Sequence, residues 1–230
     1  MIPKSIFVAC PVRSGVQPET VHTIASLPML FHEMGIAGHL QCEKGGSFLP
    51  HVRNKIADDY RASEMDAILM MDDDVAVTDG TIRRMIEADV DYVGIAFPKR
   101  ENEFSREEAE PAIELLHPIR TQNHTGIELL GVDRVGVALT LIKREVFDLV
   151  SKRSLLRAHS RLPGPGAPWH EPRFTGYFDS IEGKSEDLSF SERCYAADVR
   201  QYFLPDVDAW HAGRTLNLAE WLARQVGSKP

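Results

Sequence analysis

The sequence predicts an α/β protein, in which a mostly parallel sheet is flanked by helices in a single domain over residues 1–230. Short apolar runs alternate with helical patterns over the first hundred residues, in the order expected of a parallel sheet. With 43% hydrophobic and 26% charged residues, a chain of 230 residues can bury a substantial core. Its apolar stretches are far shorter than the roughly 20 residues that cross a bilayer, so we expect no membrane span.

The first strand and helix are indicated by the residues at their ends. Residues 5–10, SIFVAC, form a β-rich run that stops at Pro11, which is typical of a buried first strand. Over residues 18–34 apolar side chains recur at helical spacing, and Gly35 supplies a C-terminal stop. We expect Pro28 to kink this helix.

The next elements continue the alternation. A short strand is expected over residues 37–42 and a helix over 52–62. The run 66–71, DAILMM, is the strongest strand pattern in the chain. A helix over 78–88 can be capped by its first threonine or aspartate, and residues 92–97, YVGIAF, form a further short strand before a proline.

The second half is less regular. Strands are expected over residues 112–116, 135–142 and 200–204, with a helix that begins at Arg144 and another over 187–197. Ligands should bind at the carboxyl ends of the parallel strands.

Cysteine content and charge limit the setting and the partners. Cys10, Cys42 and Cys194 form neither a CxxC pair nor an even set, which favours a reducing, cytoplasmic location, and no signal peptide is expected. The net charge of −8 argues against general affinity for nucleic acid. Residues 143–161 nevertheless contain six Lys or Arg against two acids.

The acidic run Asp72-Asp73-Asp74 is the main candidate for chemistry. It follows the 66–71 strand and should therefore lie at the carboxyl edge of the sheet. Three adjacent carboxylates repel one another unless a cation is shared, and Mg²⁺ or Mn²⁺ prefers carboxylate oxygens together with substrate phosphates. The alternative is a polar turn that caps the next helix.

Six segments follow one another in an order that resembles the GT-A glycosyltransferases, particularly the family 2-like group. They are FVACPVRSG, RNKIADDY, ILMMDDDV, VGVALTLIKREVFD, SEDLSFSERC and DVDAWHAG. In this resemblance they correspond to the nucleotide-binding turn, the helix before the metal strand, the DxD strand, the glycine-containing strand with its helix, the acidic catalytic motif and the segment with the distal histidine. The resemblance implies a GT-A, Rossmann-like fold over most of the chain.

The resemblance implies a metal site that binds Mn²⁺ or Mg²⁺. Asp72 and Asp74 would be the DxD carboxylates and His211 the distal ligand. Asp73 is an equal alternative, because the run contains three acids.

The same resemblance implies a site for a nucleotide diphosphate sugar. Its residues are Pro11, Val12, Arg13, Arg53, Asn54, Asp72, Asp73, Gly136, Val137 and Ala138. The first three would hold the base or ribose, Arg53 and Asn54 would reach the nucleotide, and residues 136–138 would line the sugar pocket. The alternative is that Arg53 is a surface residue or an ion-pairing residue.

Asp187, preceded by Glu186, would be the general base if the reaction inverts the anomeric centre, since a carboxylate can take the proton of an acceptor hydroxyl. With Ser185, the two acids also form a good helix N-terminus, and both roles can coexist.

The expected function is transfer of a sugar, with a UDP-sugar favoured as donor, to an acceptor hydroxyl. Residues 1–100 would form the nucleotide-binding half and residues 101–230 the acceptor-binding and catalytic half. The acceptor is a glycan, a small molecule or, as suggested by residues 143–161 and 99–100, hydroxymethylated bases of phage-type DNA. A nucleotidyltransferase and a noncatalytic binding module are the alternatives, although the first turn has only one glycine where nucleotidyltransferases carry several.

Overall fold

The structure is a computed structural model that describes residues 1–45, 48–98, 111, 119–123, 125–160, 173–211 and 214–227. Its helices are α1 (Pro18–Met34), α2 (Leu49–Ser63), α3 (Asp79–Glu87), α4 (Arg144–Arg153), α5 (Glu186–Ala196) and α6 (Leu218–Gly227). Its strands are β1 (Ser5–Val12), β2 (Ala37–Lys44), β3 (Ala67–Met71), β4 (Val75–Ala76), β5 (Tyr92–Gly94), β6 (Ile119–Gln122), β7 (Glu128–Val132), β8 (Leu139–Lys143), β9 (Ala158–Ser160), β10 (Arg173–Thr175), β11 (Gln201–Phe203), β12 (Asp208–His211) and β13 (Arg214–Asn217).

Eight strands form the main sheet, in the order β2-β1-β3-β8-β5-β11-β7-β6. β8 is antiparallel to β3 and β5, and β7 is antiparallel to β11 and β6, so the other six strands share one direction. The prediction of an α/β fold with a mostly parallel sheet is confirmed. A three-stranded sheet, β13-β12-β4, lies beside it.

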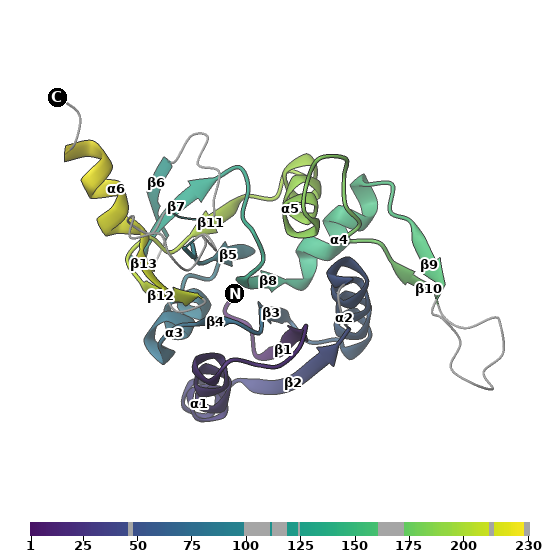
Figure 1. The fold of residues 1–230 in the computed structure, drawn as a ribbon, viewed down its shortest axis with the longest axis horizontal. Helices are drawn as coiled ribbons and strands as arrows, with labels where there is room; N and C mark the ends of the chain where they lie inside the picture. Colours follow the sequence, from purple (N-terminus) through teal and green to yellow (C-terminus); the bar gives the residue numbers. More distant parts are fainter. Residues whose placement is uncertain are drawn as a thin grey trace.

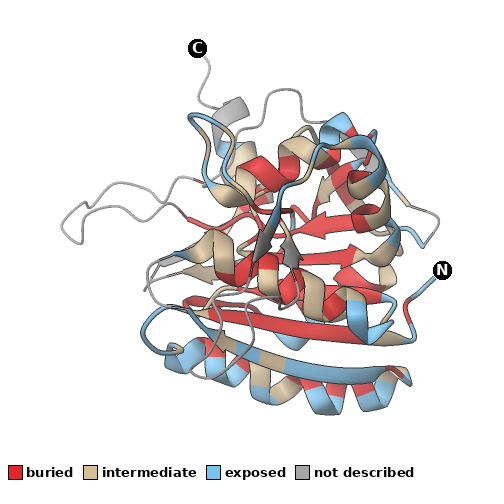
Figure 2. Ribbon diagram, turned by 90° about the vertical axis from the view of Figure 1, so that its right-hand side faces the viewer, coloured by how far each residue is buried: buried red, intermediate tan, exposed pale blue. Residues whose placement is uncertain are grey.

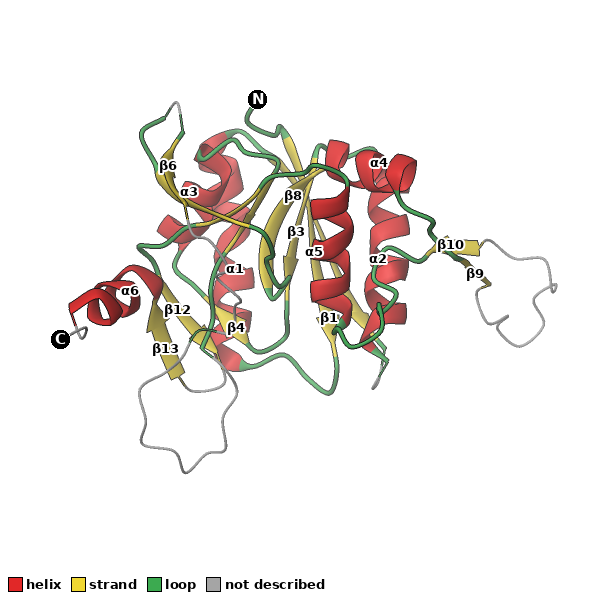
Figure 3. Cartoon of the chain, turned by 90° about the horizontal axis from the view of Figure 1, so that it is seen from above, coloured by secondary structure: helices red, strands yellow, loops and turns green. Residues whose placement is uncertain are grey.

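Helices cover both faces of the main sheet (Figures 1 and 3). Along β1, Phe7 and Ala9 point toward the core under α2, α4 and α5, whereas Ile6 and Val8 point toward the core under α1 and α3. This alternation follows from the two-residue period of a strand. Figure 2 shows the central strands buried and the outer sides of the helices exposed.

Local sequence signals account for several boundaries. α1 runs continuously through Pro28 and ends at Gly35, whose φ of 67° suits glycine. α2 begins at Leu49, three residues before the predicted start, because Pro50 is compatible with the first turn of a helix. The side chain of Thr78 caps α3 by accepting from the backbone N–H of Thr81, as the sequence predicts.

Other boundaries differ from the predictions. The strand predicted over 135–142 begins only at Leu139, because the preceding residues form a loop bound to α5 by hydrogen bonds described below. The strand predicted over 92–97 ends at Gly94. β4, β6, β7, β9, β10, β12, β13 and α6 were not predicted, and the strand predicted over 112–116 lies outside the described residues. Among the described helices, none combines the length and apolar character that a membrane crossing requires.

Candidate functional site

A cleft opens at the carboxyl ends of β1, β3, β5 and β11. It consists of two adjoining hollows of about 280 Å³ and about 190 Å³, which share Arg13, Leu49 and Asp72. The larger hollow extends toward α5 and His211, and the smaller one toward the turn after β1. The position agrees with the rule that ligands of α/β sheets bind beyond the carboxyl ends of the strands.

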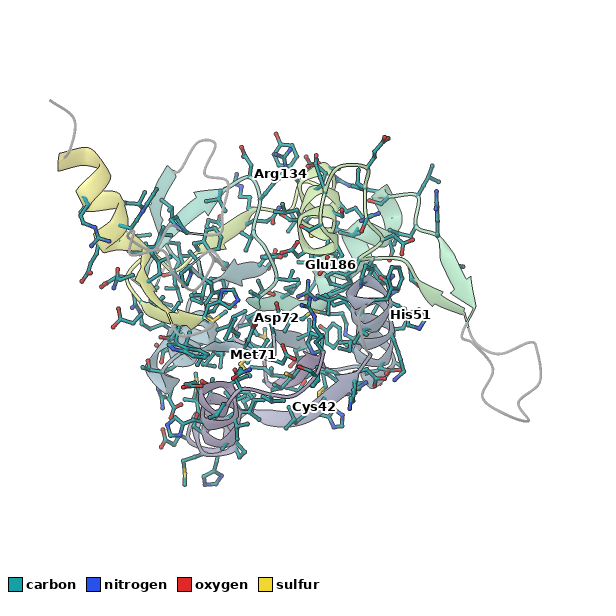
Figure 4. All side chains as sticks on the ribbon, viewed as in Figure 1. Cys42, His51, Met71, Asp72, Arg134 and Glu186 are labelled. Atoms are coloured by element: carbon teal, nitrogen blue, oxygen red, sulfur yellow. The ribbon has the colours of Figure 1, made fainter. Side chains whose placement is uncertain are left out.

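Arg53 joins the two sides of the larger hollow. Its side chain is only 2% exposed, and its two terminal nitrogens donate to Asp72 Oδ1 at 2.5 Å and to Glu186 Oε1 at 2.9 Å. These residues come from α2, from the end of β3 and from the start of α5, and Figure 4 shows Asp72 and Glu186 near the centre of the molecule. The guanidinium therefore fixes the spacing of two carboxylates that line the cleft.

The charges of this group influence one another strongly. Burial alone would lower the pKa of Arg53, but the carboxylates of Asp72, Glu186 and Asp187 outweigh it and raise the pKa. Burial raises the pKa of the Asp72 carboxyl, and the neighbouring Arg53 offsets this only in part. Arg53 thus forms two ion pairs, as the ion-pairing alternative predicts.

The three adjacent aspartates have different partners. Asp72 binds Arg53, whereas Asp73 Oδ2 accepts from the backbone N–H of Arg13 at 2.8 Å. The Asp73 carbonyl also accepts from the backbone N–H of Gln17 at 2.8 Å, so Asp73 holds the turn that forms one wall of the smaller hollow. Asp74 is 9% exposed and faces His211.

His211 is oriented by a backbone carbonyl. Its Nδ1 lies 2.8 Å from the Pro98 oxygen, which only accepts, so Nδ1 carries the hydrogen. In the neutral ring Nε2 then presents a lone pair, and this atom lies 3.5 Å from Asp74 Oδ2. Two electron-rich atoms that face each other favour a proton or a metal ion, and histidines that bind metal commonly donate their other N–H in this way.

Backbone pairing explains how residues so distant in sequence meet. β12 is antiparallel to β4, with His211 opposite Val75, the residue that follows Asp74. Within the residues that the structure describes, no group of three or more His, Cys, Asp or Glu side chains could hold a metal ion by itself. Asp74 and His211 fit as two ligands of a site that a substrate phosphate could complete, whereas the carboxylates of Asp72 and Asp73 are engaged elsewhere.

Asp187 lies in the first turn of α5, as the sequence predicts. Its Oδ1 accepts from the backbone N–H of Leu188 at 2.7 Å and from the Ser185 hydroxyl. Its Oδ2 faces Gly136, where an added Cβ atom would lie 2.9 Å away. One oxygen is thus held by the helix start, and the other lies beside the glycine that lines the cleft.

The loop before β8 is attached to α5. The backbone N–H of Val135 donates to Ser191 Oγ at 2.8 Å, and Arg134 Nε donates to Glu192 Oε2 at 2.6 Å. At the other end, the carbonyl of Ala138 accepts from the backbone N–H of Asp72 at 2.8 Å. These bonds hold residues 136–138 against the cleft.

The predicted donor residues divide into two groups. Those that line the cleft are Pro11, Arg13, Arg53, Asp72, Asp73, Gly136 and Ala138. Val137 is fully buried in the core, and half-buried Val12 does not line either hollow. Asn54 is 1% exposed; its Oδ1 accepts from the backbone N–H of Phe178 at 2.6 Å, and its Nδ2 donates to Asp179 Oδ1 at 2.9 Å. It lines a separate hollow on another side of α2.

Several residues of the cleft were not predicted. Ile95 and Phe97, which follow β5, and Phe203, which ends β11, form apolar parts of the larger hollow. Leu49 borders both hollows at the start of α2. The signal for the first three was their position at the carboxyl end of a strand, which applies to apolar residues as well as to acids.

A scan against protein-family models finds no match, and a search of the curated proteins finds no significant match either.

Proposed function

We propose that the protein is a metal-dependent glycosyltransferase that moves a sugar from a nucleotide diphosphate sugar, with a UDP-sugar favoured, to an acceptor hydroxyl. The observation that carries the proposal is the pair Asp74 and His211. The hydrogen bond from His211 Nδ1 to Pro98 directs Nε2 toward the Asp74 carboxylate at 3.5 Å, next to a cleft at the carboxyl edge of the sheet.

Asp74 and His211 would hold Mn²⁺ or Mg²⁺. When bound, the ion neutralises the charge that develops on the departing diphosphate. A histidine nitrogen together with a carboxylate oxygen suits Mn²⁺ better than Mg²⁺, which prefers oxygen ligands only.

The smaller hollow suits the nucleotide. Pro11, Arg13 and Asp73 line it, and Arg13 is exposed, so its guanidinium can meet phosphate oxygens. The N-terminus of α2 borders both hollows at Leu49, and the positive end of a helix dipole favours an anion. The sugar would then extend along Gly136 and Ala138 in the larger hollow.

Asp187 is better placed than Glu186 to act as the general base. Glu186 is bound by Arg53, whereas Asp187 Oδ2 faces the glycine that lines the cleft. If the reaction inverts the anomeric centre, the acceptor oxygen bonds to the anomeric carbon as the bond to the diphosphate breaks. The hydroxyl proton passes to Asp187, and the nucleoside diphosphate leaves.

Basic residues within 143–161 make contacts inside the protein, which favours a glycan or small molecule over DNA as the acceptor. Lys143 binds Asp89, and Arg153 binds Asp198. Arg144 donates to the carbonyls of Arg61 and Met65 and covers the ring of Tyr60. Three of the five basic residues that the structure describes in this segment thus serve internal contacts, and Lys99, Arg100 and Arg161 lie outside the described residues.

The test is a thermal-shift screen of UDP and GDP with and without Mn²⁺, because a ligand that binds only the folded state raises its stability. We expect a metal-dependent rise in Tm with one nucleotide and its loss in Asp74→Asn. The matched control is Asp91→Asn, since the Asp91 side chain is 61% exposed and borders neither hollow. The proposal fails if no nucleoside diphosphate gives a metal-dependent shift, or if Asp74→Asn keeps it. Release of pyrophosphate from a nucleoside triphosphate would support nucleotidyl transfer instead.

A further inference from the structure

A separate hollow of about 300 Å³ lies beside the start of α2. The described residues around it include Phe48, His51, Asn54, Arg157, Asp179 and Ser180. In Figure 4 His51 and Asp72 lie on opposite sides of α2, so this hollow is distinct from the cleft.

Its wall is held by buried hydrogen bonds. Asn54, itself 1% exposed, binds both Asp179 Oδ1 and the backbone N–H of Phe178. The backbone N–H of Gly176 donates to the Arg157 carbonyl at 2.7 Å, and an added Cβ at Gly176 would lie 2.3 Å from Asp179 Oδ2. A glycine is therefore required where the backbone passes the Asp179 carboxylate, which fixes that carboxylate at the wall of the hollow.

The side chains around the hollow combine one apolar surface with several polar groups. Phe48 is 66% exposed, so the face of its ring is open to a ligand at the edge of the hollow. Around it lie the guanidinium of Arg157, the imidazole of His51, the hydroxyl of Ser180 and the carboxylate of Asp179. A sugar ring presents the matching surfaces, because it has apolar C–H faces and hydroxyl groups around its edge that both donate and accept.

The hollow and the cleft share two segments of chain. In the first turns of α2, Leu49 and Arg53 line the cleft, whereas His51 and Asn54 line the hollow. Residues 179–187 lead from the hollow to the cleft, where Asp187 stands. The backbone N–H of Ile181 donates to Ser189 Oγ at 2.8 Å, which attaches this segment to α5. A single ligand that occupied both would have to pass around the first turn of α2.

We propose that this hollow is a saccharide-binding subsite, in which Phe48 stacks on a sugar ring of the acceptor while Arg157 and Asp179 bind its hydroxyl groups. The assignment of the saccharide as acceptor rests on the proposed glycosyl transfer. It identifies the acceptor as an oligosaccharide, whose remote part occupies the hollow while its reactive hydroxyl enters the cleft.

The test uses an array of defined, immobilised oligosaccharides as the probe and the full chain as the protein. We expect the wild-type protein to bind at least one structure on the array, and Phe48→Ala to lower its affinity for that structure about tenfold. Arg157→Ala should weaken it as well, since the side chain is exposed and its backbone contact to Gly176 is kept. The matched control is Met29→Ala on α1, whose side chain is 65% exposed and which should bind like the wild type.

Absence of binding to any structure on the array, or unchanged binding by Phe48→Ala, would overturn the subsite. The thermal-shift screen with UDP, GDP and Mn²⁺ is run on the same preparations, so the two proposals can fail separately. If the nucleotide still shifts Tm but saccharide binding is unchanged in Phe48→Ala, only the subsite is rejected. Saccharide binding that depends on Phe48, without any nucleotide shift, rejects the glycosyltransferase but keeps the subsite.

Discussion

Gly136 lies so close to the Asp187 side chain that there is no room for a methyl group between them. A Cβ atom added at Gly136 would lie 2.9 Å from Asp187 Oδ2. A Cβ atom and a carboxylate oxygen are too close at this distance, so an alanine at position 136 would force the Asp187 carboxylate to turn away. The contact joins the loop before β8 to the first turn of α5, and it sets where the proposed base points in the cleft.

Gly136→Ala should therefore lower kcat about tenfold to a hundredfold, because small displacements of a reacting group have effects of that size. The fold should be little affected, since the added atom meets a carboxylate oxygen and not the backbone. The measurement is turnover of the nucleotide sugar identified by the screen, together with Tm. Gly80→Ala is the control, because its nearest contact would be an ordinary 3.7 Å. Unchanged kcat in Gly136→Ala would contradict the role of Asp187.

His211→Ala should weaken Mn²⁺ binding in the presence of nucleotide more than about tenfold, given that even residues that only orient metal ligands contribute this much. Asp73→Asn should leave Mn²⁺ affinity close to the wild-type value, because the Asp73 carboxylate binds the backbone of Arg13. Titration of Mn²⁺ monitored by electron paramagnetic resonance measures both.

The control for this series is His22→Ala, an exposed histidine on α1. The assignment of the metal to Asp74 and His211 would be wrong if Asp73→Asn lost the metal and His211→Ala kept it.

Arg53→Met should destabilise the protein by about 3 kcal/mol, because removal of the buried cation leaves the half-buried carboxylates of Asp72 and Glu186 uncompensated. Arg53 is 2% exposed and binds both Asp72 and Glu186. Arg83→Met serves as control: its ion pair with Glu33 is exposed, and such pairs contribute about 0–1 kcal/mol. Urea denaturation at neutral pH gives both values.

The loss in Arg53→Met should also depend on pH. Burial already raises the pKa of the Asp72 carboxyl, and removal of the cation raises it further. Because the folded-state pKa then exceeds the unfolded-state value, stability falls as pH rises from the unfolded value through the folded one. The deficit relative to the wild type should thus shrink when the pH is lowered toward 4. A deficit that is constant from pH 4 to 7 would mean that lost packing, and not charge, causes it.

The sequence predicted those helix boundaries that depend on residues near them in the chain. The helix predicted over 18–34 has the observed bounds of α1, and the cap at Thr78 and the first turn of α5 are also as predicted. The shorter β8 was not predicted, because its apolar run extends into a loop whose hydrogen bonds go to Ser191, more than fifty residues later. A buried loop and a buried strand look alike in hydrophobicity.

The candidate site was predictable by residue type but not by partner. The pattern identified Asp72 to Asp74 as a group, yet their partners come from Arg53, Arg13 and His211. The last contact depends on pairing between β12 and the two-residue strand β4, which is too short for any sequence pattern to mark. Val137 illustrates the reverse case: it lies between two residues of the cleft, but its side chain belongs to the core.

Glu192→Gln tests how the loop before β8 is held. Hydrogen bonds from Lys184 and then Arg134 lower the pKa of the Glu192 carboxyl, which lies beneath that loop on α5. A folded-state pKa below the unfolded one contributes stability above the unfolded pKa, and that stability is lost as pH falls through the folded pKa. We therefore expect Glu192→Gln to cost about 1 kcal/mol at neutral pH, and the difference from the wild type to vanish in acid. Denaturant titrations at several pH values measure this, with Glu220→Gln as control because its pair with Arg224 is exposed.

Since Arg134 adjoins Val135 and Gly136, the Glu192→Gln variant should also lower kcat at neutral pH, while the Glu220→Gln control should not. Loss of stability without loss of kcat would show that the loop keeps its position without this ion pair.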